Sequence, residues 1–231
     1  MKHLTGTRHL IPAIGAAALL LAWHLPAHAA EGLPKVLLIG DSICSSYQKL
    51  VTKAFEGKAE VQRTGGGTHT RNALEKGGNA LGDGKWAVIH FNWGLWDMRH
   101  ELKDGKLTYA VPIEEYEANL RKLVAQMKAT GAKLIWASTT PVLWDEPGRG
   151  RTNPDVIRYN EAAAKVMKEN GIAIDDLYAV IKPRINELQS KAYDIDVHYN
   201  AQGSQVLSEA LVQSIQAALG SVPSAPEQQG K

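Results

Sequence analysis

Short apolar runs alternate with helical patterns along most of the chain. Val36 to Ile39 is continuously apolar and stops at Gly40, which is typical of a strand buried on both faces of a parallel sheet. Similar apolar segments recur further along, so the pattern predicts strands at 36–39, 59–62, 86–91, 133–137 and 172–175.

Three other segments carry apolar residues at spacings of three and four, the period of an amphipathic helix. They are 113–127, with Pro112 before it and Gly131 after it; 153–171, with Asn153 as the expected cap; and 206–215. Strands that alternate with helices predict right-handed crossovers and a parallel sheet covered on both faces. The segments 102–111 and 138–152 are expected to be long loops, which in a compact domain are often functional.

The two ends of the chain differ from this pattern. Residues 1–29 contain Lys2 and Arg8, then an apolar run, then Ala27-His28-Ala29, the three parts of a cleaved signal peptide. The run is shorter than the roughly 20 residues of a membrane span. We therefore expect a secreted or periplasmic protein without stable membrane insertion, one domain over 30–220, and a disordered polar tail over 221–231.

Composition narrows the classes of partner. The 231 residues include 26 Lys and Arg against 24 Asp and Glu, and removal of Lys2 and Arg8 with the signal peptide leaves 24 of each. Such a balance disfavours a nucleic-acid partner. One cysteine excludes an intramolecular disulfide, and no H-E-x-x-H or paired histidine spacing supports a metal site, so no cofactor is expected.

Candidate chemistry follows the predicted strands, because ligands of open α/β sheets bind beyond the carboxyl ends of the strands. Ser42 follows the first strand and is either a nucleophile or a helix N-cap. His198 precedes the last helix. It is either the base that takes the proton of Ser42 or a loop histidine, and Asp196 or Asp194 is the acid that would orient it. Asn92 is either an oxyanion-hole donor or a cap of its strand end.

Several other residues have a structural interpretation. His90 is expected in the core, His69 and His100 in surface turns, and Cys44 as a small buried residue. Three tryptophans, Trp93, Trp96 and Trp144, fall in loops at the expected crevice. They are either core residues or a stacking platform for sugar rings or acyl groups.

Taken in order, four blocks resemble the GDSL/SGNH hydrolase superfamily over roughly residues 35–219. They are Gly40-Asp41-Ser42-Ile43, the glycines at 65–67, Asn92-Trp93-Gly94-Leu95-Trp96-Asp97 and Asp196-Val197-His198-Tyr199-Asn200. The resemblance implies a three-layer α/β/α sandwich, flavodoxin-like, with a five-stranded parallel sheet, in a single domain.

The same resemblance implies site roles. Ser42 matches the nucleophile and His198 the base, with Asp196 preferred as the third member, and Ser42 and Gly67 match oxyanion donors through their N–H groups. The third block is usually G-x-N-D, but Trp96 stands where asparagine is expected, so Asn92 is the expected substitute. The last block is usually D-x-x-H, but the residue three before His198 is Ile195.

These observations predict an exported serine esterase that acts on a small-molecule or polysaccharide ester through an acyl-enzyme, most specifically a carbohydrate O-acetylesterase. The alternatives are a lipid esterase or lysophospholipase, an O-acetyltransferase with the same triad, and a polysaccharide-binding module of the same fold that has lost the reaction.

Overall fold

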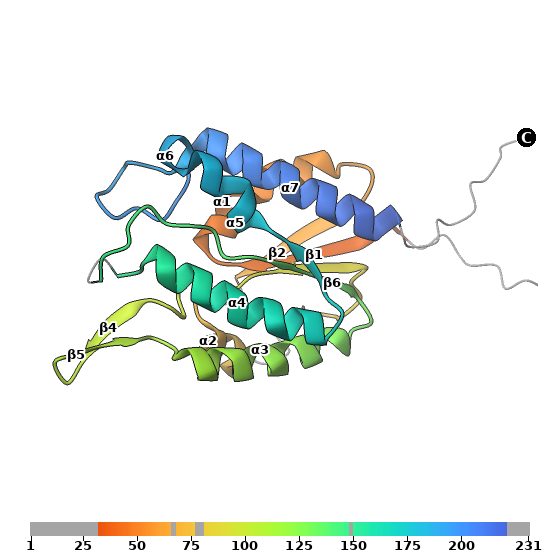
Figure 1. Ribbon diagram of the computed structural model, residues 1–231. Coiled ribbons are helices and arrows are strands. Elements are labelled where there is room, and N and C mark those ends of the chain that lie inside the picture. Colours follow the sequence, from red (N-terminus) through yellow and green to blue (C-terminus); the bar gives the residue numbers. More distant parts are fainter. Residues whose placement is uncertain (1–31, 66–67, 77–80, 148–149, 221–231) are drawn as a thin grey trace, which may run out of the picture. The chain divides into compact units, whose positions relative to one another are not determined.

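Five parallel strands form the central sheet, in the order β2-β1-β3-β6-β7 (Figure 1). Their bounds are Lys35–Gly40 for β1, Glu60–Gly65 for β2, Val88–Phe91 for β3, Lys133–Ala137 for β6 and Ala173–Asp175 for β7. This order is flavodoxin-like, with its switch point between β1 and β3. The predicted fold class is therefore confirmed, and the five predicted strands are the strands of this sheet.

Figure 1 draws a computed structural model of the protein, which describes residues 32–65, 68–76, 81–147 and 150–220. The predicted signal peptide, 1–29, and the predicted tail, 221–231, lie outside the described residues. Within them, no helix is long and apolar enough to cross a membrane.

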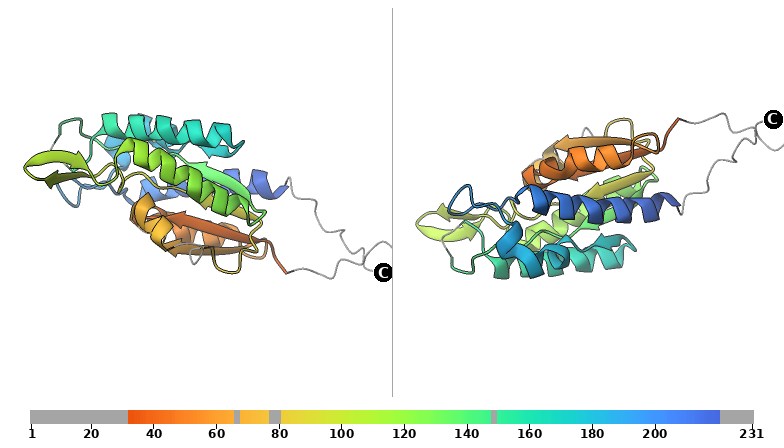
Figure 2. Two further views of the ribbon diagram at one scale, coloured as in Figure 1. Left: turned by 90° about the horizontal axis from the view of Figure 1, so that it is seen from below. Right: turned by 90° about the horizontal axis from the view of Figure 1, so that it is seen from above.

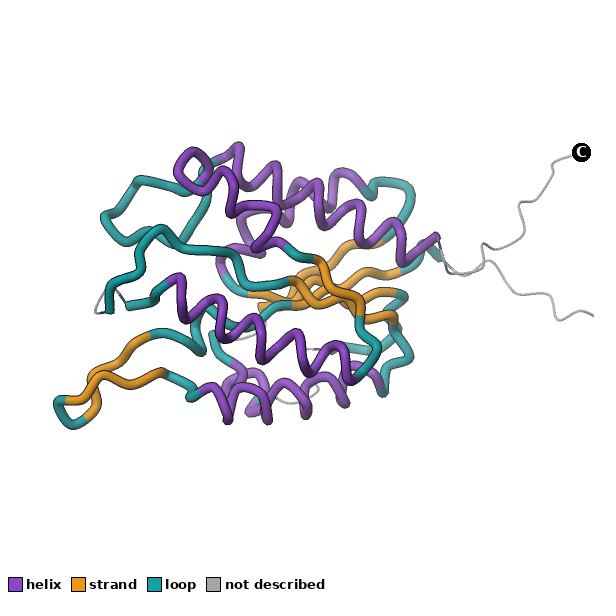
Figure 3. Tube along the Cα trace, viewed as in Figure 1, coloured by secondary structure: helices purple, strands orange, loops and turns teal. Residues whose placement is uncertain are grey.

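Helices cover both faces of the sheet (Figures 1 and 2). One face carries α1, Ser42–Ala54, and α7, Ala201–Gly220, which lie side by side; the other carries α3, Ile113–Lys128, and α4, Asn153–Glu169. The shorter elements are α2, Thr70–Glu75; α5, Leu177–Ile181; a 3-10 turn, Lys182–Arg184; and α6, Ile185–Leu188. The tube view shows the resulting three layers (Figure 3).

The apolar patterns find their partners in the core between these layers. Val36, Leu38 and Val88 on the sheet are fully buried, as are Leu120 of α3 and Val156 of α4. Burial of such side chains is worth roughly 1.5–3 kcal/mol each. Helix α4 differs from the prediction in one respect, since its N-cap is Thr152, whose hydroxyl accepts from Asp155 N, and Asn153 is already helical.

The prediction of a long loop over 102–111 is wrong in part. It contains an antiparallel hairpin of β4, His100–Lys103, and β5, Lys106–Tyr109. Asp104 and Gly105 both have positive φ, 52° and 72°, as a two-residue hairpin turn requires. The Asp-Gly pair is the sequence signal of such a turn, although the flanking strands are charged and lack the apolar alternation of a typical hairpin. The described part of 138–152 has no helix or strand, as expected.

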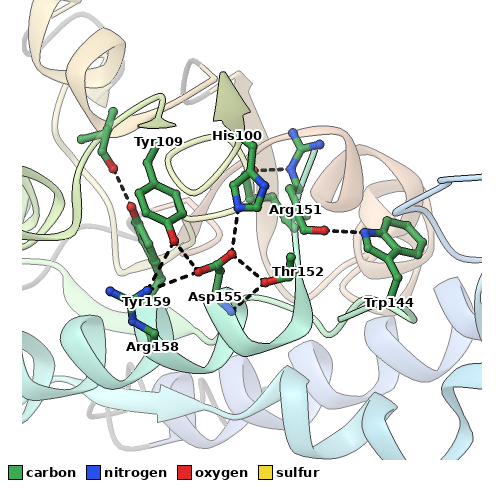
Figure 4. Close-up of polar contacts among 10 residues, drawn as sticks. His100, Tyr109, Trp144, Arg151, Thr152, Asp155, Arg158 and Tyr159 are labelled. Atoms are coloured by element: carbon green, nitrogen blue, oxygen red, sulfur yellow. Dashed lines mark hydrogen bonds and ion pairs between the residues drawn. The ribbon is translucent and has the colours of Figure 1, made fainter. Parts of the chain in front are cut away.

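One carboxylate fastens this hairpin to the rest of the domain (Figure 4). Asp155 Oδ2 lies 2.9 Å from His100 Nε2, and Asp155 Oδ1 accepts from Tyr109 Oη at 2.8 Å. His100 and Tyr109 are register partners at the base of the hairpin. The placement of His100 in a surface turn is therefore wrong, because its side chain is buried and bonds the carboxyl group of a residue 55 positions further along the chain.

Candidate active site

The site lies where β1 and β3 send their following segments to opposite faces of the sheet. After β1 the chain turns at Gly40 and enters α1 at Ser42. A Cβ on Gly40 would stand 2.6 Å from Cys44 Cβ, so glycine is needed for the helix to pack back on its strand. The Asp41 carboxylate caps α1 by accepting from Ile43 N at 2.9 Å. This turn leaves Ser42 at the mouth of the crevice.

Ser42, His198 and Asp196 are joined by a continuous chain of hydrogen bonds. His198 Nε2 lies 2.8 Å from Ser42 Oγ, and His198 Nδ1 lies 2.6 Å from Asp196 Oδ1. A carboxylate opposite Nδ1 requires the proton on that nitrogen, which leaves Nε2 as the acceptor of the serine hydroxyl proton. The structure thus brings together the three residues that the sequence singled out for this role.

Asp196, and not Asp194, is the acid that meets the histidine. Its side chain is 3% exposed, against 44% for His198. Burial alone would raise the pKa of Asp196, but hydrogen bonds from Ser190 and from the backbone and imidazole of His198 outweigh it and hold the pKa below its usual value. The acid is therefore ionised when an imidazolium forms beside it. Asp194 is exposed on the same loop.

The loop that carries His198 is tied down at its two ends. Gln189 and Tyr199 form an isolated antiparallel bridge, and the Gln189 side chain donates to Asp196 O. Tyr199 Oη donates to Pro141 O at 2.8 Å. These bonds fix the loop although its middle is exposed.

A pocket of about 630 Å³ opens beside Ser42. Its wall comes from the turn after β1, the end of β2, helix α2 and the segment after β3. The lining residues are Gly40, Asp41, Ser42, Ser45, Arg63, Gly65, Thr68, Asn72, Lys76 and Trp96. Apart from the indole, none of these side chains is a large apolar one.

The structure gives Asn92 a role other than the expected one. Its amide nitrogen donates to Ala137 O at 2.8 Å and to Thr139 Oγ1 at 3.2 Å, which occupies both of its hydrogens. The amide thus ties the end of β3 to the end of β6, and the prediction that it donates into the oxyanion hole is wrong. The alternative interpretation, a cap of the strand end, is the one observed. Gly67, the other expected donor, lies outside the described residues.

The segment after β3 is locked in place beneath the pocket. Gly94 passes so close to Thr139 that a Cβ would stand 2.2 Å from its Oγ1. Asp97 is fully buried and its Oδ1 accepts from both the N–H and the hydroxyl of Thr70, at 2.9 and 2.5 Å. Asp97 therefore attaches this segment to the first turn of α2. Burial raises the pKa of Asp97 to about 7.

Of the three tryptophans proposed as a platform, only Trp96 lines the pocket with Ser42. Trp93 is 5% exposed and packs on Phe91. Trp144 is 9% exposed, lies against a different pocket and donates through its indole N–H to Arg151 O (Figure 4). The prediction of a stacking platform is therefore wrong for Trp93 and Trp144, because both rings are buried in the hydrophobic core.

The sequence pattern does not predict the basic side chains that lie near Trp96 or line the pocket with it. Arg151 and Arg99 place their guanidinium carbons 5.1 and 5.5 Å from the centre of the indole ring. Arg63 lies on edge strand β2, where its Nη1 donates to Gly40 O at 3.2 Å, and Lys76 ends α2. Nothing in the local sequence around Arg63 and Lys76 indicates that they line a pocket with Ser42, because that depends on the pairing of β2 with β1.

The remaining titratable residues have structural roles. His90 is buried and bonds Asp175 at 2.9 Å across the sheet, which confirms it as a core histidine. His69 caps α2 through its Nδ1. Cys44 is buried and its pKa is raised by burial to about 12, so it is no nucleophile. The described ranges contain no group of three or more His, Cys, Asp or Glu side chains able to hold a metal ion.

Comparison with known proteins agrees with this geometry. The chain is 28% identical over 215 residues to the human isoamyl acetate-hydrolyzing esterase 1 homolog, covering 82% of this chain and 84% of that protein. It is 26% identical to a GDSL esterase/lipase of Arabidopsis thaliana, covering 75% and 82%.

Solved structures share the fold. A lipase/acylhydrolase from Enterococcus faecalis matches with a TM-score of 0.65 at 18% identity, over 80% of this chain and 96% of that one. An acetylxylan esterase from Geobacillus stearothermophilus matches with a TM-score of 0.63 at 19% identity, over 79% and 94%.

A family model covers most of the domain. The model of the GDSL-like lipase/acylhydrolase family matches residues 38–206, which include Ser42, Asp196 and His198. The chain therefore belongs to the GDSL-like lipase/acylhydrolase family and is an esterase of the GDSL/SGNH type.

Proposed function

We propose that the protein is an exported serine esterase that removes acetyl groups from carbohydrate hydroxyls through a covalent acyl-enzyme. The observation that carries this proposal is the chain of hydrogen bonds from Ser42 through His198 to Asp196 at the edge of an open pocket. A serine hydroxyl becomes a strong nucleophile when a positioned base takes its proton.

In this mechanism Ser42 Oγ forms a bond to the ester carbonyl carbon while its proton passes to His198 Nε2. The negative carbonyl oxygen is held by the Ser42 N–H at the start of α1, with Gly67 as the second proposed donor. His198 then gives its proton to the leaving alkoxide as the C–O bond breaks. Water attacks the acyl-enzyme by the same route, which releases acetic acid and returns the proton to Ser42.

The lining of the pocket supports a short acyl group. A long acyl chain needs a groove of aliphatic side chains. The described lining around Ser42 is polar or charged except for glycine backbone and the indole of Trp96. This favours an acetylesterase over a lipid esterase or lysophospholipase.

Two further observations support a carbohydrate substrate and an exported enzyme. Trp96 offers an aromatic ring at the pocket, as sugar-binding sites commonly do, and acetylxylan esterases are among the proteins that share the fold. The charged start, apolar run and Ala27-His28-Ala29 of residues 1–29 support export to the periplasm or medium.

Labelling with a fluorophosphonate probe tests the nucleophile, with Ser42→Ala as the matched control. We expect the wild type to be labelled and the variant to remain unlabelled. An unlabelled wild type that still binds acetylated polysaccharide would overturn the proposal in favour of a binding module.

Hydrolysis of 4-nitrophenyl acetate and octanoate tests the acyl group. We expect kcat/KM for the acetate to exceed that for the octanoate by at least tenfold. The reverse order would indicate a lipid esterase. Transfer of acetyl to a sugar hydroxyl in preference to water would indicate an acetyltransferase.

A further inference from the structure

Positive charge gathers on the wall of the pocket beside Ser42. Arg63 and Lys76 both line it, one from strand β2 and one from the end of α2. Arg63 uses Nε on Gln48 and Nη1 on Gly40 O, which fixes the guanidinium group in place. A cation held by neutral partners keeps its charge available to a ligand.

Two more cations lie against the ring of Trp96, next to the residues that line the pocket. The guanidinium groups of Arg151 and Arg99 lie within 6 Å of its ring centre. Arg151 is placed by bonds at both ends, since its Nε donates to Leu95 O and its carbonyl accepts from the Trp144 indole (Figure 4). Burial and the neighbouring Arg99 lower the pKa of Arg151 to about 10, so it is still a cation near neutral pH.

Carboxylates balance these four cations only in part, since the Asp41 carboxylate attracts Arg151 without a direct ion pair. No ion pair within 4 Å joins any of them to an acid in the described residues. The one acidic residue lining the pocket is Asp41, whose carboxylate caps α1, and burial raises its pKa. The pocket therefore presents a positive potential on one side of the nucleophile, although the chain without its first 29 residues carries no formal net charge.

We propose that the substrate is an ester whose alcohol part carries an anionic group, such as the carboxylate of an acetylated uronic acid, and that Arg63 and Lys76 bind this group. The proposal rests on the esterase function proposed above and names its substrate class. Because an acetyl group has no position for a charge, the anion belongs to the alcohol. The planar guanidinium of Arg63 suits a carboxylate, and the exposed ammonium of Lys76 adds a second charge.

A pair of chromogenic acetates separates charge from shape. The anionic substrate is 5-acetoxy-2-nitrobenzoate, and its neutral partner is 5-acetoxy-2-nitrobenzamide, which has the same size and leaves as a nitrophenol. Each rate is divided by the rate of hydroxide hydrolysis of the same ester. We expect kcat/KM for the carboxylate to exceed that for the amide at least fivefold at 20 mM salt. The preference should shrink at 500 mM salt, because salt screens exposed charges.

Charge-removing variants locate the effect. Lys76→Gln and Arg63→Gln should each lower the carboxylate-to-amide ratio about twofold to fivefold, the size expected of one partly exposed ion pair. Lys168→Gln is the matched control, since Lys168 is an exposed lysine in the last turn of α4, away from the carboxyl ends of the strands, and its loss should leave the ratio unchanged.

The outcomes distinguish this proposal from the proposed function. A wild type that hydrolyses 4-nitrophenyl acetate through Ser42 but shows no preference for the carboxylate would overturn the anionic substrate and leave the esterase intact. A preference that survives both Lys76→Gln and Arg63→Gln would also overturn it. Absence of both labelling and hydrolysis would instead refute the proposed function.

Discussion

Two pockets of nearly equal volume flank the triad and differ in charge. The pocket on the Ser42 side, about 630 Å³, is lined by Arg63 and Lys76. The pocket on the Asp196 side, about 620 Å³, is lined by Asp145, Glu146 and Asp194, with Lys191 as its one lysine. The anionic substrate proposed above would be drawn to the first pocket and repelled by the second, and this difference would set the direction in which it lies at the nucleophile.

The two sides are also built differently. The basic side rests on Asp97, a buried carboxylate that bonds Thr70 at the start of α2. The acidic side rests on Gln189, which bonds Asp196 O at the base of the exposed loop. One wall therefore depends on a buried carboxyl group whose ionised form is disfavoured by burial, and the other on a neutral amide.

The largest effect should come from the acid that orients His198. Asp196→Asn should lower kcat by about 10³- to 10⁴-fold, because an amide that donates toward Nδ1 favours the wrong tautomer of the imidazole. Asp194→Asn, two residues away, should change kcat less than twofold. Steady-state hydrolysis of 4-nitrophenyl acetate measures both, and equal losses in the two variants would contradict the assignment.

The buried Asp97 should make the free energy of unfolding depend on pH. Asp97 has a pKa of about 7 in the folded protein and near 3.8 unfolded. Between these values the folded state binds the proton more tightly, so the contribution of Asp97 to stability is full below about pH 4 and is lost as the pH rises through 7. The loss amounts to a few kcal/mol.

Asp97→Asn should remove this dependence, since the amide oxygen still accepts from Thr70. Urea unfolding at pH 4.5 and 7.5 measures it: the free energy of unfolding of the wild type, relative to the variant, should be lower at the higher pH. A difference between the two proteins that is independent of pH would mean that Asp97 is ionised throughout the range.

A smaller effect is expected at Asn92. Asn92→Ala should lower the free energy of unfolding by about 1–3 kcal/mol, because Ala137 O and Thr139 Oγ1 lose their donor between β3 and β6. Thermal or urea unfolding provides the measurement. A fall of 10² or more in kcat at unchanged stability would show that the amide turns to the substrate after all.

The smallest effect should come from the acidic pocket. Glu146→Gln removes an exposed charge on the Asp196 side and should change the carboxylate-to-amide ratio less than twofold, and only upward. The two chromogenic acetates measure it beside Lys76→Gln. A fall in the ratio as large as that of Lys76→Gln would mean that the charge difference between the pockets does not direct binding.

The parts of the molecule that could be predicted from sequence are those set by local pattern. Strand 133–137 has its predicted bounds, because a short apolar run of this length with β-branched and aromatic residues is typical of a buried strand. Ser42 and His198 could be located because each occupies a fixed place relative to a strand end or a helix start. Their contact, between residues 156 positions apart, follows from the order of the sheet.

Features decided by long-range contacts could not be predicted. The Asn92 amide is used by Ala137 and Thr139, both on or after a strand more than 40 residues away. Whether a tryptophan faces the pocket of Ser42 or the core depends on its neighbours in space, which separates Trp96 from Trp93 although both stand in the same loop. The cations on the pocket wall belong to the same class of feature.

The attachment of the β4–β5 hairpin has a consequence for protease sensitivity. His100, Tyr109, Thr152 and Arg158 all bond the one carboxylate of Asp155, whose pKa stays low because the hydrogen bonds of Thr152, Tyr109 and His100 outweigh the effect of burial (Figure 4). The hairpin beyond this point carries a widely exposed Leu102 and a tip at Asp104 and Gly105. Loss of that single carboxylate would remove side-chain anchors of both strands at once and leave the His100 N–H bond to Gly150 O and the packing of Tyr109 on Tyr159. The arm should then be cut by proteases more readily while the sheet beneath it remains folded.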